Sequence, residues 1–206
     1  KGDKLEPDLT GGDIGVQCTA TSHEVVDRAL HAIVAAAHGA ATLRWSQYGF
    51  VRDPLPGEKG GTPRNILGFK DGTNNLKAEE PDLLDEHVWV QSGDGPDWMT
   101  GGTYAVARRI RMHIETWDRS PLTEQELIIG RTKGTGAPLG GTGEFEPANF
   151  RSIDANGTPV IPLTAHVRLA SSDSLNGIKI LRRGFNFVDG SDDRGHLNAG
   201  LFFICF

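Results

Sequence analysis

An acid in a glycine-rich loop is the first candidate for chemistry. Asp71 stands in the segment Gly68–Asn75, which reads GFKDGTNN. Small and polar residues of these types commonly form turns in which Asn and Asp side chains bind the backbone, so a structural turn is the default interpretation. The functional interpretation is a carboxylate held rigidly in a loop, with backbone amides free to meet a cofactor. The pattern alone leaves both interpretations open.

Two consecutive arginines form the second candidate. Arg182 and Arg183 lie inside the otherwise apolar segment Ile180–Phe185, which reads ILRRGF. Successive side chains of a strand point to opposite faces, so a strand here would direct one of the two inward. A buried guanidinium requires an anion, which is either a carboxylate or a charged ligand.

A histidine beside an apolar stretch is the third candidate. His166 lies in Thr164–Leu169, which reads TAHVRL, and we expect it between two strands. No two of the seven histidines have the i, i+4 spacing of a helical metal pair. A lone histidine is more often structural or exposed than a metal ligand, so the pattern by itself favours the structural role.

Two further motifs fail on their details. The glycine-rich run 134–143 lacks the Gly-Lys-Ser/Thr of a phosphate-binding loop, and Pro138 removes one amide that such a loop would use. The acidic segment 189–195 has Arg194 where a calcium-binding EF-hand loop needs Gly, and Gly200 where it needs Glu. We therefore interpret the first as a connector and the second as a hairpin turn.

Taken together and in order, several segments resemble the dye-decolourising peroxidase family. The segment Asn65–Asn75 is similar to the family's Gly-x-x-Asp-Gly signature. The other segments that carry the resemblance are Arg44–Gln47, Gly130–Lys133, Gly136–Leu139, Ala165–Ala170, Ile180–Gly184 and Gly200–Phe206. The resemblance runs from about Gly11 to the last residue and is strongest to the branch of exported deferrochelatase/peroxidase proteins.

The resemblance implies a haem b cofactor and a role for each candidate residue. His166 matches the axial ligand of the haem iron. Asp71 and Arg182 match the acid and the arginine on the opposite, peroxide-binding face, whereas Arg183 has no such match. The segments that match the family's other haem contacts contain Gly72, Thr73, Asn74, Ser171, Ser172 and Asp173, and Arg182 also faces the cofactor.

These roles agree with the chemistry of peroxide reduction. Peroxide must lose a proton from one oxygen and the other oxygen must gain one, which a positioned carboxylate such as Asp71 can do as an acid/base catalyst. Arg182 supplies fixed positive charge where negative charge develops. The resemblance thus implies a haem peroxidase that reduces hydrogen peroxide and oxidises phenolic or dye-like electron donors.

Two rival functions stay open at this point. The first is a deferrochelatase-like protein that releases iron from haem. The second is a haem-binding fragment without catalysis, used in assembly. The product separates the first from the peroxidase: free porphyrin and iron in one case, oxidised donor and intact haem in the other.

The pattern of apolar residues predicts an α+β fold. We expect helices over 22–38, with Ser22 as N-cap and Gly39 as its stop, and over 123–130, opened by a capping box of Thr123 and Glu126. Strands are expected over 13–19, 42–52, 87–90, 103–114, 178–188 and 199–206.

The resemblance implies two ferredoxin-like halves with antiparallel sheets and packed helices, of the dimeric α/β barrel type, with haem in the second half. We expect residues 1–60 to be the C-terminal part of the first half and 61–206 the haem-binding half. We also expect the chain to be incomplete at both ends.

Composition excludes several classes of protein. The net charge is −6 and the pI about 5.6, so the chain lacks the basic surface that nucleic-acid binding needs. No apolar run approaches the roughly 20 residues of a membrane helix. Cys18 and Cys205 are the two cysteines, which excludes a disulfide framework and a cysteine-based zinc site.

The expected partners are hydrogen peroxide and a small-molecule or dye electron donor, with a homo-oligomer left open. Resemblance to the exported branch implies the twin-arginine route to the cell envelope or the medium. This sequence does not include that signal, which says little about location, and the cytoplasm stays open as the alternative.

Overall fold

The computed structural model describes residues 2–51 and 61–206, and the chain divides into two compact units, Lys1–Tyr48 and Gly49–Phe206. We describe each unit by itself.

The first unit consists of the 3-10 helix η1 (Pro7–Leu9), the helix α1 (His23–Ala36) and extended backbone. The predicted helix is confirmed, although the Ser22 side chain accepts no capping hydrogen bond. The strand predicted over 13–19 is wrong: in the described part of the unit this segment forms no strand and pairs with none. Side chains join the segments instead, since Trp45 Nε1 donates to the Gly11 carbonyl at 2.9 Å.

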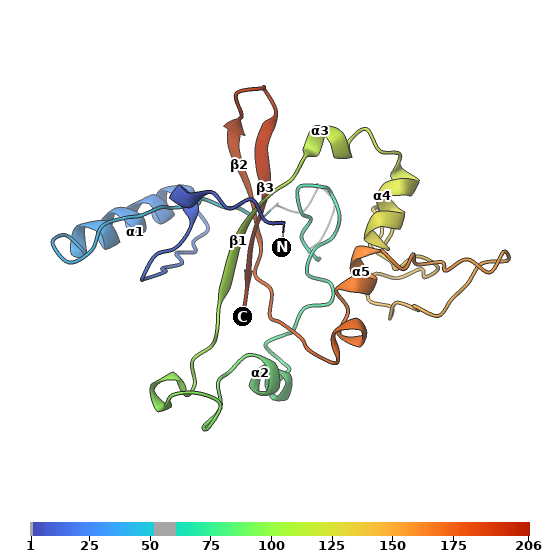
Figure 1. Ribbon diagram of the computed structural model, residues 1–206, viewed down its shortest axis with the longest axis horizontal. Helices are drawn as coiled ribbons and strands as arrows, with labels where there is room; N and C mark the ends of the chain where they lie inside the picture. Colours follow the sequence, from blue (N-terminus) through green and yellow to red (C-terminus); the bar gives the residue numbers. More distant parts are fainter. Residues whose placement is uncertain (1, 52–60) are drawn as a thin grey trace. The chain divides into compact units, whose positions relative to one another are not determined.

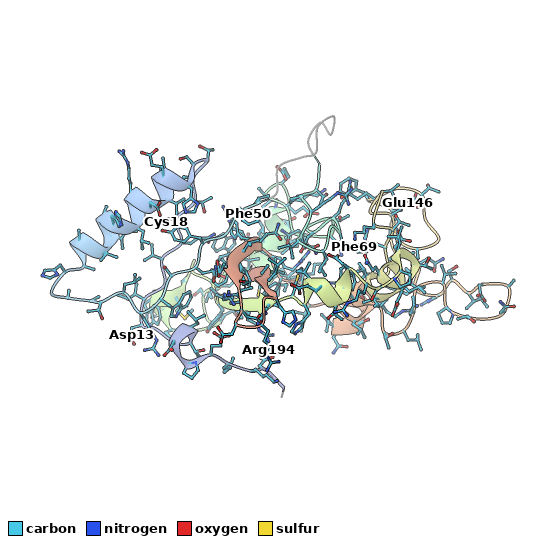
Figure 2. The ribbon with its side chains drawn as sticks, turned by 90° about the horizontal axis from the view of Figure 1, so that it is seen from above. Asp13, Cys18, Phe50, Phe69, Glu146 and Arg194 are labelled. Atoms are coloured by element: carbon cyan, nitrogen blue, oxygen red, sulfur yellow. The ribbon has the colours of Figure 1, made fainter. Side chains whose placement is uncertain are left out.

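The second unit contains a three-stranded antiparallel sheet. Its strands are β1 (Val106–Arg111), β2 (Phe185–Ser191) and β3 (Leu197–Cys205), in the order β1-β3-β2 (Figure 1). In the register, Arg109 lies opposite Phe202 and Phe187 opposite Gly200. The sheet confirms the strand expected over 103–114 and the hairpin expected near the C-terminus, whose turn carries Arg194 (Figure 2).

The strand predicted over 178–188 is confirmed only from Phe185, where β2 begins, and the strands predicted over 42–52 and 87–90 are not formed in the described residues. Residues 178–184 are extended but form only the single bridge of Arg182 with Cys205. In the segment predicted over 42–52, Phe50 forms a single bridge with Asn186, and residue 52 lies outside the described residues. His87, predicted to begin a strand, is instead the last residue of a helix, α2 (Pro81–His87). Pro at the first position of a helix fixes its starting geometry, which explains this beginning.

Short helices complete the second unit: η2 (Asp97–Met99), α3 (Ile114–Trp117), α4 (Leu122–Ile129), α5 (His166–Leu169) and η3 (Ser172–Leu175). The helix predicted over 123–130 corresponds to α4. Its N-cap is Pro121, so the predicted capping box is wrong, but Gly130 ends it with φ 90° as expected of a glycine stop. His166 begins α5, so its predicted place between two strands is also wrong.

The buried apolar side chains of the described residues all belong to the second unit. They are Phe69, Leu76, Val88, Val90, Ala137, Ile161, Ala165, Phe187 and Ala199. Phe69, labelled in Figure 2, is 2% exposed and meets Trp117 edge-on at 6.1 Å between ring centroids. This packing anchors the chain two residues before Asp71. In the part of the chain that the structure describes, no helix is both long and apolar enough to cross a membrane.

Candidate active site

The structure brings together an acid and an arginine that lie 111 residues apart in the sequence. Arg182 Nη1 donates to Asp71 Oδ1 at 2.8 Å, and the two groups form an ion pair. The Asp71 side chain is 25% exposed and that of Arg182 is 29% exposed. The pair is therefore shielded by protein, but small molecules in solution can still reach it.

The loop that carries Asp71 is fixed by its own backbone and side chains. The Asp71 N–H donates to the Pro63 carbonyl at 2.8 Å. Asn65 Oδ1 accepts from the N–H groups of Leu67 and Phe69, which is an Asx-type turn. The turn expected from composition is thus present, and it presents the Asp71 carboxylate rigidly.

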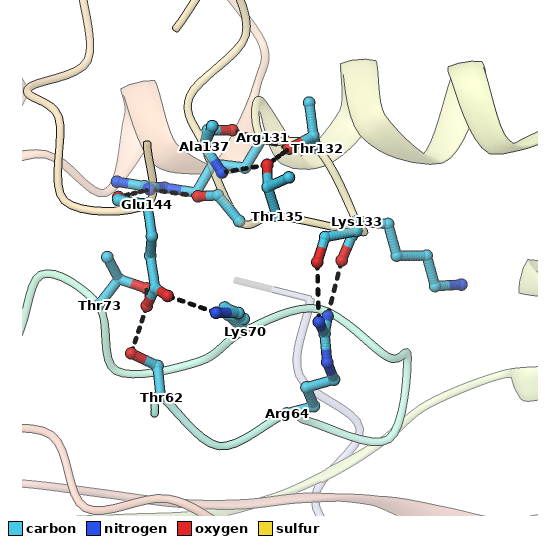
Figure 3. A network of polar contacts seen from close by, with 12 residues as sticks. Thr62, Arg64, Lys70, Thr73, Arg131, Thr132, Lys133, Thr135, Ala137 and Glu144 are labelled. Carbon is cyan, nitrogen blue, oxygen red and sulfur yellow. Dashed lines mark hydrogen bonds and ion pairs between the residues drawn. The ribbon is translucent and has the colours of Figure 1, made fainter. Parts of the chain in front are cut away.

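A buried acid, Glu144, holds both flanks of Asp71. Its side chain is 9% exposed and accepts from Lys70 Nζ at 2.5 Å, from Thr73 Oγ1 at 3.0 Å and from Thr62 Oγ1 (Figure 3). Burial by itself would raise the pKa of Glu144, but these three hydrogen bonds outweigh it and hold the pKa below its ordinary value. Glu144 is therefore an ionised anchor for the loop.

An arginine makes a second connection between the same two loops. Arg64 Nη1 donates to the carbonyls of Lys133 at 2.6 Å and Gly68 at 2.9 Å, and Nη2 donates to Gly134 at 2.9 Å (Figure 3). A Cβ at Gly136 would lie 2.8 Å from Lys70 Cδ, so glycine permits the close approach. The glycine-rich run, interpreted from sequence as a connector, thus packs directly against the loop of Asp71.

A cavity of about 490 Å³ opens beside the ion pair. Asp71 and Arg182 line it, as do Gly72 and Thr73 among the residues predicted to contact a cofactor. Asn74 is exposed and is not part of this wall. Ser171, which precedes η3, and Ser172 and Asp173, which begin it, are not part of the wall either.

The cavity wall also holds polar groups that sequence reasoning missed. Asn75 pairs with the backbone of Arg182, 107 residues away, so no local pattern could indicate it. Asn186 is 6% exposed and donates to the Arg64 carbonyl, whereas its Oδ1 accepts no hydrogen bond from the residues that the structure describes. Lys77 and Arg183 also line the cavity.

His166 stands apart from this cavity wall but within electrostatic range of the pair. Burial by surrounding protein lowers the pKa of His166, the positive charge of Arg182 lowers it further, and Asp71 acts in the opposite direction. Solvent nevertheless reaches the imidazole, and no hydrogen bond to it occurs among the described residues. A neutral imidazole with a free lone pair is the form that binds metals.

The backbone around His166 is firmly held. Ala165, just before it, is fully buried, and Arg168 Nη2 donates to the carbonyls of Phe150 and Ile161, each at 2.7 Å. The Cβ of an alanine at Gly130 would lie 2.5 Å from Val167 Cγ2, which shows how closely α4 ends against α5. The structure therefore fixes the position of His166 without occupying its side chain.

Comparison with known proteins identifies the family. Residues 62–206 match the model of the Dyp-type peroxidase C-terminal domain, and residues 1–51 match that of the Dyp-type peroxidase N-terminal domain. The chain belongs to the Dyp-type peroxidase family. The family resemblance seen in the sequence is thereby confirmed.

The similar proteins carry two kinds of name. A deferrochelatase of Yersinia pestis bv. Antiqua is 40% identical over 208 residues, which are 99% of this chain and 48% of that protein. A dye-decolorizing peroxidase of Thermobifida fusca is 40% identical over 205 residues, 98% of this chain and 47% of that protein. The chain thus spans about half the length of the curated relatives it matches.

A solved structure supports the predicted fold class. The oxyferrous/water mixed complex of DtpA from Streptomyces lividans superposes with a TM-score of 0.85 at 39% identity, over 91% of this chain and 51% of that one. The predicted α+β fold with antiparallel sheet and packed helices is confirmed as that of Dyp-type peroxidases.

Proposed function

We propose that this chain forms the reactive part of a haem peroxidase, which reduces hydrogen peroxide and oxidises phenolic or dye-like donors. The observation that carries the proposal is the Asp71–Arg182 ion pair, which lines a cavity and whose charges act on the His166 imidazole. An acid/base group, a fixed positive charge and a free metal ligand are the protein groups that peroxide reduction at a haem needs.

The residues present fit a haem. The cavity of about 490 Å³ lies within the range of roughly 300–1,000 Å³ usual for cofactor sites. His166 has a lone pair free to bind iron. Lys77 and Arg183 on the cavity wall form no ion pair within the described residues, so their charges are available to carboxylates such as the haem propionates.

We assign the predicted residues on this basis. His166 would be the axial iron ligand, Gly72, Thr73, Asn74 and Arg182 would contact the haem from the Asp71 side, and Ser171, Ser172 and Asp173 would contact it from the segment after His166. Residues 61–206 would be the haem-binding half, and residues 1–60 part of the other ferredoxin-like half.

A haem held by His166 would supply the two electrons needed to cleave the O–O bond. The Asp71 carboxylate accepts the proton of one peroxide oxygen and returns it to the other, which leaves as water. The Arg182 guanidinium donates hydrogen bonds to the oxygen on which negative charge develops. Its ion pair with Asp71 keeps both groups at one side of the cavity, where they can act on the same molecule.

The experiment adds one equivalent of peroxide and then a phenolic dye to the haem-loaded protein. Bleaching of the dye with the haem absorption intact supports a peroxidase. A haem-loaded protein that leaves both peroxide and dye unchanged would contradict the proposal.

Release of iron from haem is the second candidate, because curated relatives about 40% identical are named deferrochelatases. Iron release predicts two products: metal-free porphyrin, which is detected by its fluorescence, and iron, which a ferrous chelator traps. Neither product should require the dye. The same samples separate the two functions, since dye oxidation with intact haem excludes release as the main reaction.

The proposal extends to reaction partners, location and assembly. We propose peroxide and a small-molecule donor as reaction partners, and export by the twin-arginine route with a homo-oligomer as the assembly. Fractionation of the producing cells tests the proposed export, which predicts that the protein is found in the medium or the cell envelope.

A further inference from the structure

The backbone of Arg182 is held on one side by the sheet. Its neighbours bond to the end of β3: the Leu181 N–H donates to the Phe206 carbonyl at 2.9 Å, and the Arg183 N–H to the Ile204 carbonyl at 2.8 Å. In an extended chain, consecutive residues direct their N–H and C=O groups to opposite sides. The N–H and C=O of Arg182 therefore face away from β3, toward the loop of Asp71.

A side-chain amide occupies the place where a further strand would pair. The Arg182 N–H donates to Asn75 Oδ1 at 2.9 Å, and Asn75 Nδ2 donates to the Arg182 carbonyl at 2.8 Å. A carboxamide has one donor and one acceptor side by side, so it can bind both backbone groups of a single residue. Among the side chains, only Asn and Gln have this combination.

Asn75 belongs to the same loop as Asp71. Its own N–H donates to the Gly72 carbonyl at 3.1 Å, which closes the turn that begins at Gly72, directly after Asp71. One loop thus binds Arg182 twice: Asp71 binds its guanidinium and Asn75 binds its backbone. Because the contact with Asn75 fixes the backbone of Arg182, it fixes the point from which the long and flexible arginine side chain extends.

We propose that Asn75 is a positioning residue for the Asp71–Arg182 pair, and that its carboxamide fixes the backbone of Arg182 so that the guanidinium reaches both Asp71 and a ligand in the cavity. The consequence for peroxide rests on the proposed function. The structural claim does not, because it concerns a contact that exists without haem.

Three substitutions of Asn75 test this. Asn75→Ala removes both hydrogen bonds and leaves two partly buried backbone groups without partners. Asn75→Asp keeps the shape but places a carboxylate oxygen against the Arg182 carbonyl. Asn75→Gln keeps the amide on a longer side chain and should restore part of the function. Asn156→Asp, in an exposed turn of 154–158, is the control for the change of charge.

The first measurement is amide hydrogen exchange of the protein without haem, resolved by residue with NMR. Exchange at Arg182 should become about 3- to 10-fold faster in Asn75→Ala, as expected for one lost hydrogen bond, while exchange at Arg183 stays unchanged. Equal exchange at Arg182 in wild type and variant would overturn the proposal whatever the protein's activity.

The second measurement uses fluoride on the haem-loaded ferric protein, since an arginine beside bound fluoride stabilises it. Asn75→Ala should weaken fluoride binding about 10-fold and slow the peroxide reaction by about 10- to 100-fold, with the KM for the dye unchanged. In an Arg182→Ala background, which lacks the side chain that Asn75 is proposed to position, Asn75→Ala should cause no further loss of fluoride binding or of peroxide rate.

Additive losses in the double variant would also overturn the proposal. If instead the wild type, loaded with haem, fails to react with peroxide, the proposed function is wrong, and amide exchange at Arg182 still decides the role of Asn75.

Discussion

The two sides of the candidate site are held by different means. Asp71 and Arg182 are bound through their side chains, to each other and, for Arg182, to Asn75 through its backbone. His166 is the reverse: buried neighbours and Arg168 fix its backbone, while its imidazole makes no hydrogen bond among the described residues. Groups that transfer a proton need fixed mutual geometry, whereas a metal ligand needs a fixed starting point and a free lone pair.

The largest effect is expected for Asp71→Asn, which separates the function of the Asp71–Arg182 pair from that of His166. Asp71→Asn removes the proton acceptor but keeps the size of the side chain, so the peroxide reaction should slow by about 100- to 10,000-fold. Haem binding should change little, because Asp71 is not among the residues assigned to hold the haem. Stopped-flow mixing with peroxide measures the rate, and a haem titration measures haem binding. The control is Asp118→Asn at an exposed position. Asp154 is less suitable as a control, because its carboxylate accepts two backbone hydrogen bonds in a turn.

Asp71→Asn with an unchanged peroxide rate would remove Asp71 from the chemistry. If Asp71→Asn lost haem as well as peroxide rate, Asp71 would contribute to haem binding, and the two sides of the site would not have separate functions.

The second effect tests the packing that holds His166. Gly130→Ala introduces a Cβ 2.5 Å from Val167 Cγ2 at a residue with φ 90°, and should destabilise the fold by about 2–4 kcal/mol through crowding and backbone strain. Gly157→Ala has a similar φ of 80° with nothing within 4 Å, so it should cost only the strain, about 1–2 kcal/mol. Urea unfolding gives both values, and equal losses in the two variants would mean that α4 does not pack tightly against α5.

The smallest effect concerns the anchor on the Asp71 side. Glu144→Gln weakens the hydrogen bonds to Lys70 and the two threonines and should cost about 1–3 kcal/mol of stability at neutral pH. Glu79→Gln, exposed and without a contact in the described residues, is the matched control. A loss no larger than that of the control would contradict the anchoring role.

The same variant predicts a dependence on pH with a definite sign. The pKa of Glu144 is lower in the folded protein than its ordinary value of 4.5, so its ionised form stabilises the fold above that pH. This contribution is lost as the pH falls through the lowered folded-state pKa. The difference in stability between wild type and Glu144→Gln should therefore narrow below about pH 4.5, and a difference that widens in acid would contradict the assignment.

Elements with a strong local signal could be predicted from the sequence. The apolar stripe of 22–38 predicted α1, and Gly130 marked the end of α4. The strands predicted over 13–19 and 87–90 failed, because a strand exists only where another strand pairs with it, and apolar character alone does not supply that partner. At 87–90 the helix signal of Pro81 was overlooked.

The residues of the candidate site also differ in how clearly the sequence indicates them. Asp71, His166 and Arg182 could be named because they occur in segments that resemble a family, whereas periodicity and spacing left each of them ambiguous. Asn75 was missed although it adjoins the predicted Asn74, since its function depends on Arg182, 107 residues away. Glu144 was missed as well: it directly follows the glycine-rich run 134–143, which indicated only a connector, and its partners Lys70 and Thr73 lie more than 70 residues away.

The most direct test of the site is the haem spectrum of the wild type and of His166→Ala, with His196→Ala, in the β2–β3 turn, as control. We expect the visible spectrum of a histidine-ligated ferric haem in the wild type and in the control. In His166→Ala that spectrum should be lost, with haem bound more than about 100-fold more weakly. An unchanged spectrum and affinity in His166→Ala would show that His166 is not the ligand and would contradict the proposed site.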